Sequence, residues 1–274
     1  MNNATSSGAG NVNRDEHVST GRPGASAAAD PRDEATRIVK LASSRDVAVR
    51  VMGGVAVGLC CPSAQSPPLA RSYRDIDFAA RSDQGREVAA LFESAGYEAD
   101  AEFNALHGRH RMFFWDPVNR READVFLDRF AMCHTFDFRA RLGLTSPTLP
   151  IADLLLFKLQ VVETNDKDYQ DATALLADQP ATPDGLDPEG VARFLAGDWG
   201  WWRTVTRVLD SVEEYARELP GFAGSVRVSD NILALRAAIE AHPKSTRWRM
   251  RAKVGEKRRW YETPEDAHAT GPQD

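Results

Sequence analysis

The segment Asp75-Ile76-Asp77-Phe78 places two carboxylates in an otherwise apolar run. Successive side chains of a β-strand point to opposite faces, so Asp75 and Asp77 share one face while Ile76 and Phe78 share the other. Two carboxylates a few ångströms apart repel each other unless a cation lies between them. Mg²⁺ relieves such repulsion, and it typically binds a few carboxylates together with substrate phosphates. The segment therefore predicts a strand that carries part of a metal–phosphate site.

A third carboxylate, Asp124, is predicted to lie on a neighbouring strand. The runs 110–115 and 121–127 flank an Asp-Pro-Val-Asn turn, which predicts a β-hairpin with Asp124 near the middle of its second strand. Asp124 has apolar residues on both sides, as expected of a carboxylate in a buried strand. By alternation Glu122 and Asp128 share its face, so either is an alternative third ligand.

A glycine pair, Gly53-Gly54, follows the apolar run 47–51 and precedes a short apolar segment. The pattern predicts a strand, a tight turn and a helix that begins near residue 55. Glycines at such a junction let backbone N–H groups approach a phosphate, and a helix N-terminus favours negative charge. A turn without a ligand fits the same residues, because glycine pairs are common in turns. The spacing matches neither a dinucleotide-binding motif nor a P-loop.

Gly53-Gly54, Asp75-Ile-Asp77 and Asp124 together resemble the nucleotidyltransferase superfamily, which has the DNA polymerase beta-like fold. The similarity is to small bacterial members, including toxin-type nucleotidyltransferases. It extends over about residues 35–178 and includes the segment 149–160, which resembles the helix after the catalytic sheet. The chain departs from the family in the twenty residues between Gly54 and Asp75, a long loop that contains Cys60-Cys61-Pro62 and Pro67-Pro68.

The resemblance implies metal-dependent transfer of a nucleoside monophosphate from a nucleoside triphosphate, with Mg²⁺ or Mn²⁺ as cofactor. It implies that Asp75, Asp77 and Asp124 are the catalytic and metal-binding residues. It also implies nucleotide contacts from Gly53, Gly54, Arg74 and Lys158. The acceptor is left open among RNA, protein and a small molecule. For Lys158, a phosphate contact and an ordinary solvated position on an amphipathic helix fit the sequence equally well.

Composition restricts the class of protein further. The chain has 274 residues, 42% of them hydrophobic and 27% charged, which is ordinary for a globular protein. No apolar run approaches the roughly 18 residues of a membrane span, and no signal peptide is visible. Three cysteines, two of them adjacent, do not form a disulfide framework. These features predict a cytoplasmic protein without a membrane partner.

The expected fold class is α/β (α+β): a small mixed sheet with flanking helices, followed by a helical C-terminal region. We divide the chain into a disordered tail (1–32), a nucleotidyltransferase-like domain (33–178), a helical region (188–262) and a flexible tail (263–274). Further strands are expected at 74–80, 97–106 and 130–138. Helices are expected at 33–45, 83–95, from 150, and at 166–176, 188–196, 199–219 and 229–241. The charges at Lys167, Asp168 and Asp171 have the spacing that is typical of an exposed helix surface. The alternative is that they contact and position the residues of the site.

Residues 241–260 are strongly basic within a chain whose net charge is -6. They contain eight Lys or Arg side chains against Glu256 alone, a local balance of +7. Such a segment holds phosphates in some proteins and is a charged helix face in others. Two alternative functions follow: a non-catalytic relative that binds a nucleotide or a partner, as in a toxin–antitoxin pair, and an RNA-binding protein that uses this basic segment.

Overall fold

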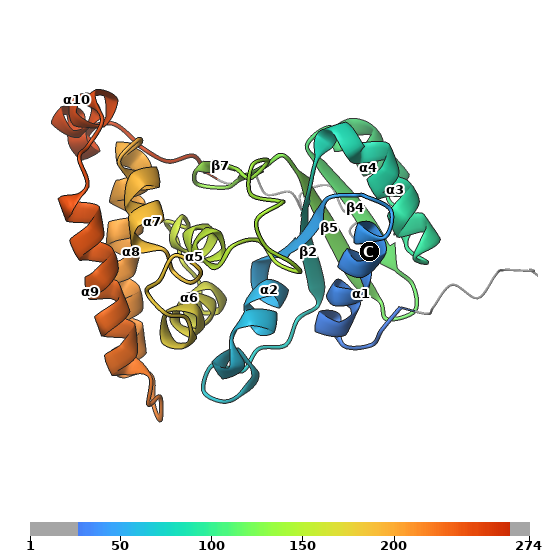
Figure 1. Cartoon of the computed structure of the whole chain (residues 1–274), viewed down its shortest axis with the longest axis horizontal. Helices are drawn as coiled ribbons and strands as arrows, with labels where there is room; N and C mark the ends of the chain where they lie inside the picture. The colour runs from blue at the N-terminus through green and yellow to red at the C-terminus, as the bar shows by residue number, and fades with distance from the viewer. Residues whose placement is uncertain (1–26, 264–274) are drawn as a thin grey trace, which may run out of the picture.

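The computed structural model describes residues 27–263. Its centre is a five-stranded mixed sheet with strand order β1-β2-β5-β4-β3 (Figure 1). The strands are β1 (Val49–Met52), β2 (Asp75–Ala80), β3 (Glu98–Ala99), β4 (Arg111–Asp116) and β5 (Arg121–Leu127). The pair β2–β5 is parallel, and the other neighbouring pairs are antiparallel. The expected α/β class and the β4–β5 hairpin are confirmed.

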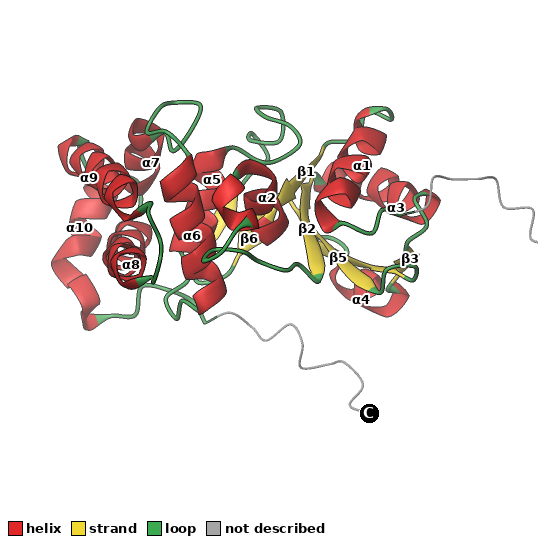
Figure 2. Ribbon diagram, turned by 90° about the horizontal axis from the view of Figure 1, so that it is seen from below, coloured by secondary structure: helices red, strands yellow, loops and turns green. Residues whose placement is uncertain are grey.

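Helices lie on both sides of the sheet (Figures 1 and 2). The first part of the chain forms α1 (Pro31–Ser43), α2 (Gly53–Cys60), α3 (Gly85–Ser94) and α4 (Ala101–His107). The apolar face of β2 packs toward α3, where the rings of Phe78 and Phe92 meet edge to face at 5.4 Å. The opposite face of β2 carries the carboxylates, so the alternation read from the sequence separates the core from the candidate site.

The second part of the chain is helical. It contains α5 (Ile151–Leu159), α6 (Asp166–Asp178), α7 (Pro188–Leu195), α8 (Trp199–Glu218), α9 (Ser225–Ala241) and α10 (Thr246–Val254). Side-chain caps explain several of these starts: Asn165 accepts a hydrogen bond from Asp168 N, and Asp198 accepts one from Gly200 N. One hydrophobic core runs from α1 to α9 without interruption, so the helical region and the sheet share their interior.

Two predicted strands are wrong. Residues 97–106 contain only the two-residue β3 and then α4, because the Asp100 side chain accepts a hydrogen bond from Phe103 N and starts a helix. Residues 130–138 form two short antiparallel strands, β6 (Arg129–Ala131) and β7 (Thr135–Asp137), instead of one. The predicted tails fall largely in 1–26 and 264–274, outside the described residues. Asp30 and Pro31 already form the start of α1.

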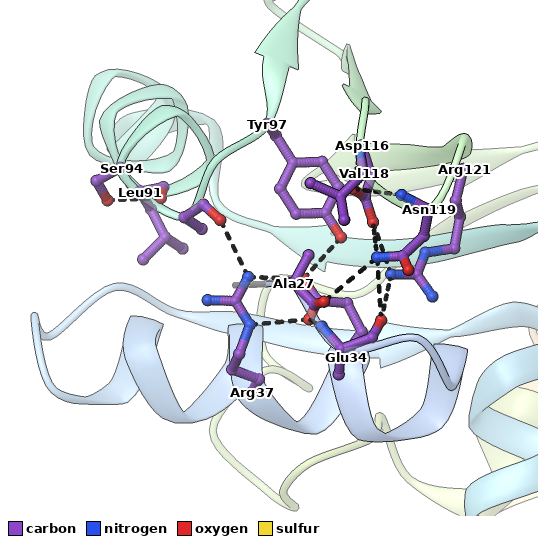
Figure 3. A network of polar contacts seen from close by, with 12 residues as sticks. Ala27, Glu34, Arg37, Leu91, Ser94, Tyr97, Asp116, Val118, Asn119 and Arg121 are labelled. Carbon is purple, nitrogen blue, oxygen red and sulfur yellow. Dashed lines mark hydrogen bonds and ion pairs between the residues drawn. The ribbon is translucent and has the colours of Figure 1, made fainter. Parts of the chain in front are cut away.

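A buried polar network fastens α1 to the sheet (Figure 3). Glu34 is fully buried and accepts hydrogen bonds from Tyr97 Oη at 2.9 Å and Arg37 Nη2 at 2.7 Å. Arg121 donates to the carbonyl of Ala28 at 2.9 Å, and Ala28 N donates to Glu34 at 2.8 Å. The network lies away from the carboxylate face of β2. Its members bond to one another, except that the buried Nε of Arg121 has no hydrogen-bond partner among the described residues. We assign it to the stability of the fold.

None of the helices between residues 27 and 263 is long and apolar enough to cross a membrane.

Candidate active site

Asp77 and Asp124 are neighbours across the parallel pair β2–β5. The register places Asp77 directly opposite Asp124 and Asp75 opposite Glu122. All four side chains therefore rise from one face of the sheet, which is the arrangement expected from strand alternation. Asp124 is 6% exposed, Asp77 is half-buried and Asp75 is exposed. Asp128 instead accepts a hydrogen bond from Ser82 N at 3.0 Å and does not line the cavity described next, whereas Glu122 does.

A cavity of about 270 Å³ lies over these carboxylates. Its apolar wall comes from β1, β4, β5, β6 and α5, and from the segments that follow β6 and α5. Its charged lining consists of Asp75, Asp77, Arg111, Glu122, Asp124, Lys158 and Asp168. The cavity therefore combines an acidic floor with two cationic side chains, which suits a ligand that brings both phosphate and metal charge.

Gly53 allows the close approach of β1 and α2 to Asp77. Met52 pairs with Asp77 in the antiparallel β1–β2 register, and the chain then turns into α2 at Gly53 with φ of 67°. A Cβ atom at Gly53 would lie 1.9 Å from Asp77 Oδ2, so any other residue would displace the carboxylate. Gly54 has a different neighbour, since a Cβ there would lie 3.3 Å from the ring of Tyr73.

Burial and like charge act together on Asp77. Desolvation is the largest influence, followed by the negative charges of Asp124 and Asp75, and together they raise the pKa of Asp77 to about 7. A carboxylate with such a pKa is only partly ionised near neutral pH. Groups in functional pockets are often perturbed in this way.

Lys158 stands in the cavity wall and is held from behind by α6. Its Nζ lies 2.9 Å from Asp171 Oδ2 and 3.1 Å from Asp168 Oδ1. Arg71 approaches the other oxygen of Asp171 at 2.8 Å. Burial opposes the charge on Lys158, but Asp171 and Asp168 outweigh it and raise the pKa of the amine. Lys158 is thus a positioned cation of the pocket, and the solvated alternative is wrong.

The expected surface position of α6 charges is also wrong for Asp171, which is fully buried. Arg74 is exposed and is not part of the cavity lining. Arg71, three residues earlier, is the arginine of this loop that reaches the site, through Asp171. For the pairing of Lys158 with the acids of α6, the sequence contained one usable signal. Lys158 lies shortly before a predicted helix that carries three acids.

Arg111 is the charged residue of the pocket that the sequence did not indicate. Its Nε donates to both oxygens of Asp124, at 2.8 and 2.9 Å, and its Nη2 makes a further contact with Oδ2. Its guanidinium lies 5.0 Å from the ring centre of Phe126 and 5.8 Å from that of Phe103. Asp124 raises the pKa of Arg111, chiefly through these hydrogen bonds.

The donor set fits a divalent metal in its chemistry but not in its present arrangement. Three aspartates converge on one cavity, and carboxylate oxygens are the ligands that Mg²⁺ prefers. Within residues 27–263, however, no group of three or more His, Cys, Asp or Glu side chains has an arrangement that could hold a metal ion. Both oxygens of Asp124 also accept hydrogen bonds from Arg111.

No protein-family model matches the chain, and no curated protein matches it in sequence. Among solved structures, the chain aligns with the solution structure of the antibiotic-resistance factor ANT(2'')-Ia. The alignment has 14% identity and covers 81% of this chain and 95% of that chain. At a TM-score of 0.28 it is a distant structural neighbour, and the function proposed below rests on the pocket itself.

Proposed function

We propose that the chain is a nucleotidyltransferase that moves a nucleoside monophosphate from a nucleoside triphosphate to an acceptor hydroxyl. The observation that carries the proposal is the placement of Asp77 opposite Asp124, with Asp75 on the same face and Lys158 in the wall of the same cavity. A scaffold gains nothing from carboxylates that repel one another. A site for metal-bound phosphate requires them.

Asp75, Asp77 and Asp124 would hold Mg²⁺ or Mn²⁺. When bound, such ions offset the negative charge of the triphosphate and lower the pKa of an attacking hydroxyl. Asp75 and Asp77 contribute oxygens from adjacent positions of one strand face, and Asp124 lies nearest to Asp77 in the register. Asp124 is also the base that takes the proton of the acceptor hydroxyl.

The triphosphate would lie between the start of α2 and Lys158. Gly53 brings backbone into the cavity, and α2 begins there without a side-chain cap on its N–H groups, which favours a nearby anion. In the reaction, the acceptor oxygen bonds to the α-phosphorus, and the bond from that phosphorus to the pyrophosphate oxygen breaks. Lys158 neutralises the charge that develops on the leaving pyrophosphate. Arg74, which is exposed, is less well placed for that role than Lys158.

The test is transfer of label from each α-labelled nucleoside triphosphate, with Mg²⁺ or Mn²⁺ and a cell extract. Asp77→Asn should abolish transfer, because the replacement keeps the shape of the side chain and removes its charge. Asp83→Asn is a matched control, since Asp83 is exposed and pairs only with Arg81 in the described residues. The nature of the labelled product identifies the acceptor as RNA, protein or small molecule. Full activity in Asp77→Asn would contradict the assignment.

A second function is favoured by one observation, the pairing of Asp124 with Arg111. A non-catalytic relative that binds a nucleotide or a partner, as in a toxin–antitoxin pair, would keep its third carboxylate neutralised in this way. Titration calorimetry with nucleoside triphosphates separates the two functions. Absence of transfer together with nucleotide binding that does not depend on metal supports the non-catalytic protein.

A further inference from the structure

We propose that α10 and the turn after it form a binding surface for the phosphodiester backbone of a nucleic acid. The inference does not depend on the proposed function, because α10 lies at the end of the helical region away from the sheet (Figure 1) and contributes no residue to the cavity. We call this region the basic surface. Its members are six exposed cations, Arg247, Arg249, Lys253, Lys257, Arg258 and Arg259.

The segment that carries the basic surface is packed against the protein. The ring of Trp248 on α10 meets that of Trp202 on α8 edge to face at 5.2 Å, and Trp260 meets Trp199 in the same way at 6.0 Å. Trp260 Nε1 also donates to Thr204 Oγ1 at 3.0 Å. These contacts hold both ends of the segment on α8, so its cations are kept together.

Arg251 joins the cations of α10 to those that follow the helix. Its guanidinium donates to the carbonyl of Gly255 at 2.6 Å and to that of Arg258 at 2.8 Å, and it lies 4.7 Å from the ring centre of Trp199. These hydrogen bonds turn the chain back beside α10 where the helix ends. Arg251 is thus occupied inside the segment, whereas the six cations of the basic surface face solvent.

The charges of the basic surface are not balanced within the described chain. The segment 241–260 contains one acid, Glu256, which pairs with Arg203 of α8. Between residues 27 and 263, none of the six cations takes part in an ion pair. A polyanion relieves the repulsion among them, and the small ions released from it favour binding. The net charge of -6 makes the rest of the chain acidic, so its field directs a polyanion to this surface.

The chemistry of the basic surface favours a phosphate backbone over a membrane or another protein. Four of the six cations are arginines, which bind phosphate through paired hydrogen bonds. Arg259 lies 4.7 Å from the ring centre of Tyr261, and this pair offers a flat surface on which a base can stack. The large exposed apolar residues of α10 are Met250 and Val254 alone. They are too few to insert the helix into a bilayer or to form the apolar centre of a protein interface.

The test is binding of the full chain to a fluorescein-labelled uridine homopolymer, and to a thymidine DNA of the same length, by fluorescence anisotropy between about 50 and 200 mM salt. No metal or nucleoside triphosphate is present. The wild type should bind both, with an affinity that falls steeply with salt. Equal affinity for the two polymers identifies the shared backbone as the ligand, and tighter binding of RNA adds contacts to its 2′-hydroxyl groups. Both results support the surface.

Replacing Arg247, Arg249 and Lys253 together by Gln should weaken binding about tenfold at the lowest salt and reduce the salt slope by about 2, because three phosphate contacts are lost. Replacing Arg86, Arg109 and Arg120 by Gln is the matched control. These are also three exposed cations, but they lie outside the segment, so binding should be unchanged. If the first variant does not fold, the same replacement at Lys257, Arg258 and Arg259 carries the test.

Arg251→Lys tests the arrangement of the cations at constant charge. Lysine cannot reproduce the fork that holds the carbonyls of Gly255 and Arg258, so the variant should bind RNA about fivefold more weakly and with a smaller salt slope. Arg249→Lys is its control, since the exposed side chain keeps its charge and should bind as the wild type does. Circular dichroism verifies that each variant is folded at the temperature of the assay.

Three results would overturn the proposal. One is wild-type affinity in the folded α10 variant, and another is an equal loss in that variant and its three-arginine control. The third is binding of the wild type to phosphatidylserine vesicles without an anisotropy change for either nucleic acid, which would assign the surface to an anionic membrane. Asp77→Asn keeps the basic surface and should bind nucleic acid normally, so failure of the transferase proposal leaves this one standing.

Discussion

At the scale of single residues, the position of Asp77 depends on the absence of a side chain at Gly53. The turn from β1 into α2 passes so close to Asp77 that a Cβ at Gly53 would lie 1.9 Å from its Oδ2. The same glycine has φ of 67°, a conformation that other residues adopt at a cost of about 1–2 kcal/mol. Two separate reasons therefore require glycine here, one of space and one of backbone conformation.

Gly53→Ala should abolish transfer and lower stability, because it combines backbone strain with displacement of Asp77. Gly96→Ala is a control for strain alone, since Gly96 has φ of 96° and a Cβ added there would meet nothing within 4 Å. The control should lose about 1 kcal/mol of stability and keep its activity. Urea unfolding and labelled-nucleotide transfer measure the two effects. Equal activity losses in both variants would refute the role of close approach.

Asp77 should also reduce stability at neutral pH. Its pKa is about 7 in the folded protein against an ordinary value of 3.8 for an aspartate, so between these values the folded state holds more protons than the unfolded state. Stability therefore falls as pH rises through that interval. Asp77→Asn removes this penalty and should be more stable than wild type at pH 8, by about 2 kcal/mol after solvent screening. Urea titrations should show a smaller difference at pH 5 and none below pH 4.

At the scale of elements, α5 and α6 are joined to the loop before β2 by one buried carboxylate. Asp171 is fully buried and pairs with Lys158 on α5 and Arg71 on the loop. The arrangement holds the amine of Lys158 at the cavity wall. It also fastens the end of the long segment between Gly54 and Asp75, whose length distinguishes this chain from the family that its motifs resemble.

Asp171→Asn should destabilise the fold by about 3 kcal/mol, because it leaves two cations without their shared counter-ion in a poorly solvated place. Asp168→Asn is the matched control on the same helix. Asp168 pairs with Lys158 at 3.1 Å but is only half-buried, so its replacement should cost less than about 1 kcal/mol. Urea unfolding at pH 7 measures both. Similar losses would show that burial does not distinguish the two acids.

At the scale of the whole molecule, the basic segment is partly structural and partly open surface. Arg251 lies 4.7 Å from the ring centre of Trp199 and donates to the carbonyl of Gly255, and Trp260 Nε1 donates to Thr204 Oγ1 at 3.0 Å. Glu262 N binds the carbonyl of Cys133, in the β6–β7 hairpin whose Phe130 lines the cavity. Six basic side chains remain exposed: Arg247, Arg249, Lys253, Lys257, Arg258 and Arg259.

If the acceptor is RNA, replacing Lys257, Arg258 and Arg259 by Ser should weaken its binding and flatten the dependence of affinity on salt, by about 0.7–0.9 in slope for each phosphate whose partner is removed. Point replacements are preferable to truncation, which would uncover Trp199. Exposed Arg86, Arg109 and Arg120, replaced together by Ser, are the control for net charge. Fluorescence anisotropy with a labelled RNA at several salt concentrations is the measurement. An unchanged slope would exclude phosphate contacts from these three residues.

Local patterns in the sequence were sufficient for several parts of this protein. Alternation along residues 75–78 placed Asp75 and Asp77 on one face and Phe78 in the core, and the Asp-Pro turn predicted the hairpin that carries Asp124. The period of apolar residues also predicted most of the C-terminal helices. Each of these features depends on residues a few positions apart, so it can be read without knowing the fold. The strand predicted over 97–106 failed because Asp100 caps a helix that periodicity does not reveal.

The tertiary structure alone decided which charges meet. The sequence determined that three aspartates, a glycine pair and a lysine occur on predictable elements. It did not determine that Arg111 binds Asp124, that Asp171 joins Lys158 to Arg71, or that Arg74 stays exposed. Those pairings depend on strand register and on the packing of α5 and α6, which are set by contacts between residues far apart in the chain. Side-chain alternation is a local property, whereas the partner of a buried charge is a property of the assembled fold.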